Sequence, residues 1–156
     1  MSVSVSVQNC IIRQGIHYDV IRHAFTTDSM HTAQAAHIPG DQLAKCVMLK
    51  DESGFLMAIV PATHRVEFGA LRNQFDRRLG LTTETELAGL FTDCQPGAIP
   101  PLGTAYGIEA VLDESLAACG DIYFEAGDHQ NVVHVSGKDF LMLLGGSKRG
   151  RFSHHV

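Results

Sequence analysis

The sequence predicts a single α/β domain in which helices pack around a mixed β-sheet. The chain has 156 residues, which suits one domain able to bury roughly 70% of the surface that the unfolded chain exposes. Strand and helix patterns interleave along it. Several predicted strands are joined by short turns and not by crossover helices, which favours a mixed sheet. We find no internal repeat or linker, so we expect one domain over residues 16–146.

The N-terminal part of the chain is predicted to contain a short helix followed by a β-hairpin. Small polar and apolar residues alternate from Met1 to Val7 without the regions of a secretory signal, so residues 1–15 should form an edge strand or a loose tail. A strand is expected over residues 16–24. A helix should start at Asp28-Ser29 and stop at Pro39-Gly40. Strands over residues 43–49 and 55–60 flank the turn-prone residues 50–54.

The rest of the chain alternates helices and strands. Apolar residues at helical spacing predict a helix over residues 66–79, and Thr83 with Glu86 forms a capping-box pattern at the start of a second helix. After a Gly/Pro loop over residues 97–103, strands are predicted over 107–112, 122–124 and 131–135, and a helix over 137–144. Residues 147–156 are expected to form a C-terminal tail.

Composition and charge exclude several classes of protein. The formal net charge is −5, and the one basic cluster is Lys148-Arg149-Gly150-Arg151. The chain therefore lacks the basic face of a DNA-binding protein, and a contact with RNA would be small and local. No apolar run approaches the ~20 residues of a membrane span. The four cysteines lie far apart in the sequence, as expected of reduced thiols in the cytoplasm.

Two features could carry chemistry. Lys45 lies inside an apolar strand pattern, where its ammonium is costly unless it meets an anion such as a phosphate or carboxylate. The alternative is an edge-strand lysine whose head stays in water. The loop over residues 97–103 combines two glycines with two prolines, so some of its N–H groups could be free to hold a carbonyl or an oxyanion. The alternative is a rigid connector between a helix and a strand.

Other chemistries find less support in the sequence. Nine histidines include no metal-binding pattern, and nucleophile-elbow and phosphate-binding glycine motifs are absent, so we expect neither a metal nor another cofactor. Cys46, beside Lys45, could be an activated thiol, although a strand cysteine is more often a small core residue. The polar turn at Asp128-His129 could act on a bound water or could be an ordinary hairpin turn.

Taken together, these residues resemble the YbaK and prolyl-tRNA synthetase-associated domain family. The resemblance rests on the helix around Thr32-Ala33, the strand opening at Leu43-Ala44-Lys45, the segment over residues 60–66, and a G-x-x-x-P-x-G signature formed by Gly97, Pro101 and Gly103. It covers residues 18–144 and implies a compact fold with a barrel-like sheet. The branch that removes alanine from proline tRNA has a Lys-Asn pair at this strand. Here Cys46 follows Lys45, so assignment to that branch or to the cysteine-removing YbaK branch stays open.

The resemblance implies an aminoacyl-tRNA deacylase that acts in trans on the aminoacylated 3′ end of a tRNA, without a metal. Lys45 would hold a phosphate or polar group of the terminal nucleotide, and the loop from Gly97 through Pro101 to Gly103 would surround the ester carbonyl. The vicinal ribose hydroxyl would help to activate water. Changes at both glycines would then impair catalysis more than stability. We expect the substrate pocket to include six further residues: His31, Cys46, Ala98, Ile99, Asp128 and His129.

Two other functions use the same residues. One is a non-catalytic module that docks on a tRNA or on an aminoacyl-tRNA synthetase, which could also be a partner of the deacylase. The other is an esterase that acts on a small acyl substrate.

Overall fold

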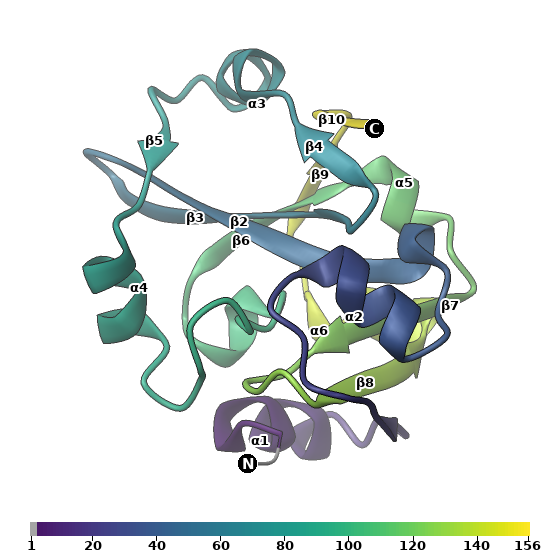
Figure 1. The fold of residues 1–156 in the computed structure, drawn as a ribbon. Coiled ribbons are helices and arrows are strands. Elements are labelled where there is room, and N and C mark those ends of the chain that lie inside the picture. Colours follow the sequence, from purple (N-terminus) through teal and green to yellow (C-terminus); the bar gives the residue numbers. More distant parts are fainter. Residues whose placement is uncertain (1–2) are drawn as a thin grey trace.

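The structure is a computed structural model that describes residues 3–156, and it forms one α/β domain (Figure 1). Eight strands form one mixed sheet, in the order β1-β8-β7-β2-β3-β6-β9 with β5 paired to β2. This confirms the predicted fold class. The strands are β1 (Asp19–Arg22), β2 (Leu43–Asp51), β3 (Gly54–Pro61), β5 (Gly80–Leu81), β6 (Glu109–Asp113), β7 (Asp121–Glu125), β8 (Asn131–Ser136) and β9 (Lys148–Gly150).

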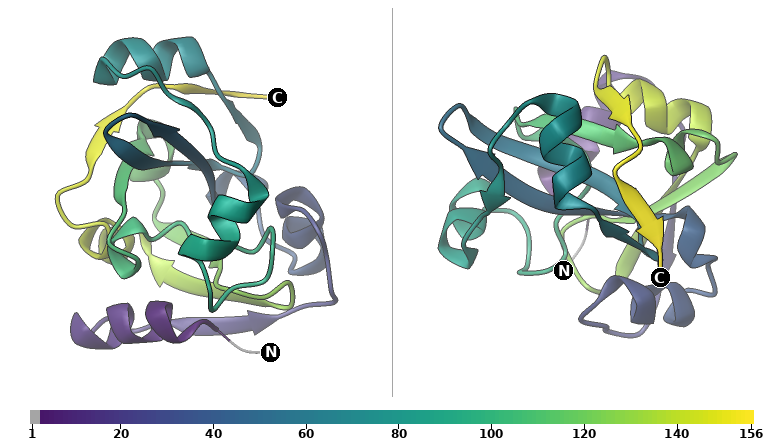
Figure 2. Two further views of the ribbon diagram at one scale, coloured as in Figure 1. Left: turned by 90° about the vertical axis from the view of Figure 1, so that its left-hand side faces the viewer. Right: turned by 90° about the horizontal axis from the view of Figure 1, so that it is seen from above.

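Helices and a separate two-stranded sheet surround the main sheet. Figure 2 shows α1 and α3 at opposite ends of the molecule, with the strands between them. A second sheet pairs β4 (His64–Val66) with β10 (Ser153–His155). The helices are α1 (Val5–Arg13), α2 (Ser29–Ala35), α3 (Phe68–Phe75), α4 (Glu84–Leu90), α5 (Glu114–Ala117) and α6 (Gly137–Leu143), with short 3-10 turns η1 (Gly40–Gln42) and η2 (Gly103–Ala105).

The main sheet curls around one large hydrophobic cluster. Side chains from β2, β3, β6, β7 and β8 all reach this cluster, together with residues of α1 and α6. A second cluster lies on the opposite face of β2 and β3, where Leu71 of α3 and Phe152 cover the sheet. A third, smaller cluster packs α2 against Leu43 and Ala62. Burial of apolar surface on both faces stabilises the central hairpin.

The prediction of an edge strand or loose tail over residues 1–15 is wrong, because this segment contains helix α1. Ser4 caps the helix by accepting a hydrogen bond from the Val7 N–H, at 3.2 Å. The buried residues Val7, Cys10 and Ile11 follow helical spacing and pack into the first cluster. Their burial outweighs the preference of valine for strands, which is a weak guide wherever tertiary packing decides.

The predicted C-terminal tail over residues 147–156 is also wrong. Strand β9 pairs in parallel with β6, and β10 pairs with β4. Phe152 lies between them and is fully buried. The folded unit therefore extends beyond the predicted 16–146 boundaries at both ends. Within residues 3–156, no helix is long and apolar enough to cross a membrane.

The predictions that rested on local signals are largely confirmed. The hairpin, the helix capped by Asp28 and the capping box are all present, with the Glu86 N–H donating to Thr83 Oγ1 at 3.2 Å. The helix predicted over residues 66–79 is shorter. It begins at Phe68, after β4, and Asp76 ends it in a left-handed conformation with φ of 50°.

Candidate functional site

A cavity of about 200 Å³ opens where strand β2 lacks a partner on one edge. On that side β2 pairs with β7 only at residues 43–44 and with β5 only at residues 49–50. Among the described residues, positions 45–47 therefore have no strand partner there. The cavity is lined by Ser29, Leu43, Ala44, Lys45, Cys46, Glu84, Leu87, Gly97, Ile99 and Glu125. The structure thus brings together four of the predicted site residues: Lys45, Cys46, Gly97 and Ile99.

Lys45 and Cys46 reach the cavity from opposite faces of β2. The partner of Lys45 in the hairpin is Val60, which belongs to the second cluster, whereas Cys46 lies opposite Ile59 of the first. Lys45 Nζ donates a hydrogen bond to the Ala62 carbonyl at 3.2 Å. Burial lowers the pKa of the Lys45 ammonium, and the nearby Arg65 guanidinium lowers it further. An anionic ligand would relieve both effects.

Cys46 has the character of a packing residue. Its sulfur lies 3.7 Å from the Ile99 carbonyl oxygen, and burial raises the pKa of the thiol to about 12. A thiol with a raised pKa is protonated at neutral pH and is a poor nucleophile. The possibility of an activated Cys46 therefore loses support.

Gly97 lies at the mouth of the cavity in a conformation that favours glycine. Its φ is 82°, and a Cβ added there would lie 3.3 Å from Cε1 of His129. Within residues 3–156, neither the Gly97 nor the Ile99 backbone N–H donates a hydrogen bond. Two free N–H donors beside one cavity are suited to holding a carbonyl or an oxyanion.

A second cavity of about 590 Å³ adjoins the first. The two share Glu84, Leu87, Gly97 and Ile99, so helix α4 and the Gly97 loop form a common wall. Phe91 and Ala88 add apolar surface to the larger cavity. Together the two hollows offer a small polar compartment beside a larger, more apolar one.

Glu125 is a buried carboxyl residue of the cavity wall that was not predicted from the sequence. It ends strand β7, and it is 7% exposed. Its Oε1 accepts a hydrogen bond from Thr32 Oγ1 of α2 at 2.8 Å. Burial raises the pKa of the carboxyl group, which the Thr32 hydrogen bond partly offsets. The nearest sequence signal is the polar turn that follows, where Asp128 and His129 are the predicted site residues.

His129 lies behind Gly97 and not in the cavity wall. Its Nε2 is 2.6 Å from the Pro96 carbonyl oxygen, and its Nδ1 is 4.0 Å from Glu125 Oε1. The ring packs edge-on against Phe25 with centroids 5.2 Å apart. It therefore supports the Gly97 loop and lies next to Glu125.

The remaining predicted site residues lie outside both cavities. His31 is exposed on α2 and pairs with Asp28, with Nδ1 2.5 Å from Oδ2. Asp128 is 1% exposed and accepts hydrogen bonds from the Gln130 and Asn131 N–H groups, so it shapes the turn before β8. The other three residues are buried within the loop: Ala98, Pro101 and Gly103.

Gly103 has a packing role. We therefore expect a substitution there to reduce stability, and not catalysis as its place in the motif suggested. A Cβ there would lie 2.4 Å from the Ile108 carbonyl oxygen and 3.1 Å from the Ala110 Cβ. We predict that Gly103→Val lowers the free energy of unfolding by about 1–3 kcal/mol, the usual cost of overpacking. Denaturant unfolding would measure this. The protein that remains folded should keep normal activity, and a stable but inactive variant would contradict the assignment.

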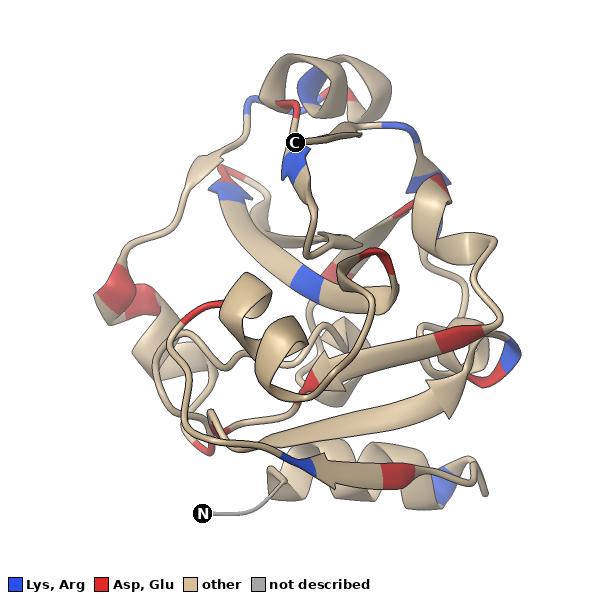
Figure 3. Ribbon diagram, turned by 45° about the vertical axis from the view of Figure 1, so that its right-hand side comes forward, with Lys and Arg blue, Asp and Glu red and all other residues tan. Residues whose placement is uncertain are grey.

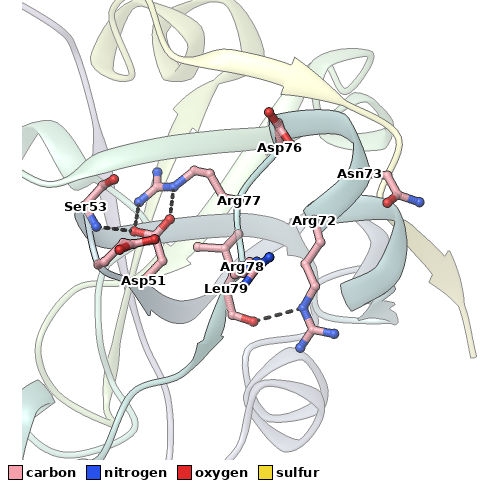
Figure 4. Close-up of a pocket in the computed structure, with 9 residues that line it drawn as sticks. Asp51, Ser53, Arg72, Asn73, Asp76, Arg77, Arg78 and Leu79 are labelled. Carbon is pink, nitrogen blue, oxygen red and sulfur yellow. Dashed lines mark hydrogen bonds and ion pairs between the residues drawn. The ribbon is translucent and has the colours of Figure 1, made fainter.

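A larger hollow of about 640 Å³ lies beside α3, and ion-paired side chains line it (Figure 4). Arg77 donates hydrogen bonds to both carboxylate oxygens of Asp51, at 2.7 and 2.8 Å, and one to Glu109 at 3.0 Å. The guanidinium lowers the pKa of Asp51 to about 2. Equal numbers of arginines and carboxylates line this hollow. Its balanced charge gives no preference for an anionic ligand.

Potential metal ligands are dispersed in the described part of the chain. No group of three or more histidine, cysteine, aspartate or glutamate side chains in residues 3–156 could hold a metal ion.

A protein-family model and several solved structures are similar to this chain. A model of the aminoacyl-tRNA editing domain family matches residues 23–143. A candidate trans-editing enzyme for prolyl tRNA synthetase has a similar structure, with a TM-score of 0.84 and 23% identity over 98% of this chain and 99% of its own. The hypothetical protein APE2540 is also similar, with a TM-score of 0.83 and 17% identity over 96% of this chain and 99% of its own. At these identities the likeness establishes the fold alone. No curated protein matches the chain in sequence.

Proposed function

This chain belongs to the aminoacyl-tRNA editing domain family, and on that basis we propose that it hydrolyses the ester of a mischarged tRNA in trans. The observation that carries the proposal is the cavity that Lys45 lines together with Gly97 and Ile99, whose backbone N–H groups are free within residues 3–156. The similar structure of a candidate trans-editing enzyme for prolyl tRNA synthetase supports the same class of reaction. Such a reaction would take place on cytoplasmic tRNA.

In the proposed complex, Lys45 and the Gly97 loop hold different parts of the substrate. The Lys45 ammonium would bind a phosphate or polar group of the terminal adenosine, which would compensate for its partial burial. The Gly97 and Ile99 N–H groups would hold the ester carbonyl and stabilise the negative charge that develops on its oxygen. The larger, more apolar cavity next to them has room for a nucleoside base.

The hydrolysis itself needs a water and a proton acceptor. The water oxygen forms a bond to the carbonyl carbon, and the bond from that carbon to the ribose oxygen breaks. One proton passes to the departing ribose oxygen, and the second leaves with the carboxylic acid and is released to solvent. The vicinal ribose hydroxyl would help to activate the water, so the protein need not supply a full triad. Cys46 would pack and not attack, because the pKa of its thiol is raised to about 12.

The charge distribution favours a local contact with RNA. Basic and acidic segments intermix over the molecule, and no continuous basic stripe crosses the view in Figure 3. The formal net charge is −5. We therefore propose that the protein recognises mainly the aminoacylated 3′ end and not the length of the tRNA.

The proposed reaction uses no metal, so chelators should leave it unchanged. Incubation with EDTA, followed by gel filtration and a deacylation assay, should give the same rate within error. The reason is the absence of a metal-ligand cluster in residues 3–156. Loss of activity that zinc restores would contradict this prediction.

Two alternatives share the cavity: a module that binds tRNA or a synthetase without catalysis, and a small-acyl esterase. A panel of mischarged tRNAs separates all three. Release of one amino acid supports the deacylase, and binding without release supports the module. Hydrolysis of simple amino acid methyl esters at a rate similar to that of the tRNA esters would support the esterase.

A further inference from the structure

A buried carboxyl group, that of Glu125, and the partly buried ammonium of Lys45 line the same cavity without pairing. Strands β2 and β7 run parallel, with Leu43 beside Tyr123 and Ala44 beside Phe124. Because side chains alternate along a strand, Lys45 and Glu125 are the next residues on the same face as Leu43 and Tyr123. The strands separate at this point, and both residues line the cavity that opens there. Lys45 instead donates to the Ala62 carbonyl.

Glu125 has no full counter-charge within residues 3–156. Its one ion-pair neighbour there is His129, whose Nδ1 lies 4.0 Å from Oε1. Thr32 supplies a neutral hydrogen bond to the same oxygen. A carboxylate that is 7% exposed is costly to keep ionised without a cation.

The hydrogen bonding of His129 involves only one of its two ring nitrogens. A carbonyl oxygen only accepts, so Nε2, which lies 2.6 Å from the Pro96 oxygen, carries the proton. Nδ1 is buried without a hydrogen-bond partner in the described residues, and at 4.0 Å it is too far from Glu125 Oε1 to hydrogen-bond to it. Glu125, which lines the cavity, therefore has unused capacity to accept a hydrogen bond from a cationic donor.

We infer that Glu125 binds the α-ammonium group of the aminoacyl ester, and this inference rests on the proposed function. The cavity would then hold a substrate at three points: an anionic or polar group at Lys45, the carbonyl at the Gly97 and Ile99 N–H groups, and the ammonium at Glu125. A free α-amino group distinguishes an aminoacyl-tRNA from a peptidyl-tRNA or an N-blocked one. Glu125 would therefore restrict the enzyme to substrates with a free amine.

Glu125→Gln is a suitable variant because it changes charge with little change in shape. The glutamine side chain keeps an oxygen that can accept from Thr32, so the contact between β7 and α2 is preserved. Glu84→Gln is the matched control. Glu84 also lines the cavity, but it is exposed in the first turn of α4. An exposed carboxylate is screened by solvent and should contribute little.

The test uses two hydrolysis-resistant probes: 3′-deoxy-3′-(L-alanylamino)adenosine and its N-acetyl derivative. Calorimetric titration of the full chain should show that the wild type binds the free amine about 10- to 100-fold more tightly, the range expected for a hydrogen bond to a charged group. Glu125→Gln should lose this preference, and Glu84→Gln should keep it. Melting curves should show that both variants stay folded.

Equal affinity of the wild type for the two probes would overturn the inference, as would a preference that survives Glu125→Gln or falls equally in Glu84→Gln. Failure to bind either probe would also overturn it. The result stays separable from that of the proposed function. A clear preference for the free amine in a protein that releases no amino acid from any mischarged tRNA would support the Glu125 site and reject the hydrolase.

Discussion

Replacing Lys45 with alanine is expected to lower the single-turnover rate of deacylation at least about 100-fold, the scale for loss of one positioned polar contact at a reacting centre. The side chain lines the cavity, and its ammonium has no carboxylate partner among residues 3–156. An ammonium held in this way is available to a substrate. The fold should survive, because the variant removes a single hydrogen bond to the Ala62 carbonyl and relieves a partly buried charge.

Lys50→Ala is the matched control for this prediction. Lys50 lies on the same strand, but its ammonium is paired at the surface with Glu86, 2.8 Å away, and it does not line the cavity. Its removal should leave the rate of deacylation within about twofold of the wild type, since surface ion pairs contribute little. A Lys45→Ala variant that turns over as fast as Lys50→Ala would reject the role assigned to Lys45.

Gly97→Val is expected to lower the deacylation rate by about 100-fold or more, the scale for loss of an oxyanion donor. The φ of 82° is unfavourable for a β-branched residue, and the new side chain would crowd the His129 ring, 3.3 Å from the added Cβ. Either effect would turn the Gly97 N–H away from the carbonyl or fill the cavity mouth. Thermal melts together with single-turnover kinetics would measure stability and rate on the same samples.

Gly107→Val separates backbone strain from obstruction of the cavity. Gly107 also has a left-handed φ, of 66°, but a Cβ there would have no neighbour within 4 Å. Strain should lower its stability by about 1–3 kcal/mol without changing the rate per folded molecule. If Gly97→Val showed the same pattern, early melting with normal turnover, the loop would be a connector only.

The parts of the fold that could be predicted from sequence are those specified by local signals. The turn between β2 and β3 and the capping box at Thr83 depend on residues a few positions apart. The two ends of the chain were predicted wrongly because their structure depends on distant partners. Helix α1 is held by the first cluster, and β9 is held by pairing with β6.

The candidate site could be predicted in part for the same reason. Lys45 can be recognised from local sequence as a cation in an apolar strand, and Gly97 as a glycine in a proline-rich loop. Glu125 could not be found in this way, because its nearness to Lys45 follows from the register of two parallel strands 80 residues apart, with Leu43 beside Tyr123. Gly103 shows the converse, since its position in the motif gave no indication that Ile108 packs directly against it.

Release of amino acid from mischarged tRNA, with protein in excess, tests the central claim most directly. Each tRNA of the panel carries a radiolabelled amino acid, and acid precipitation follows the ester that remains. The account predicts first-order release of one amino acid by the wild type, at least about 100-fold faster than by Lys45→Ala, with correctly charged tRNA left intact. Mischarged tRNAs that bind to the protein but lose their amino acids only at the spontaneous rate would contradict it.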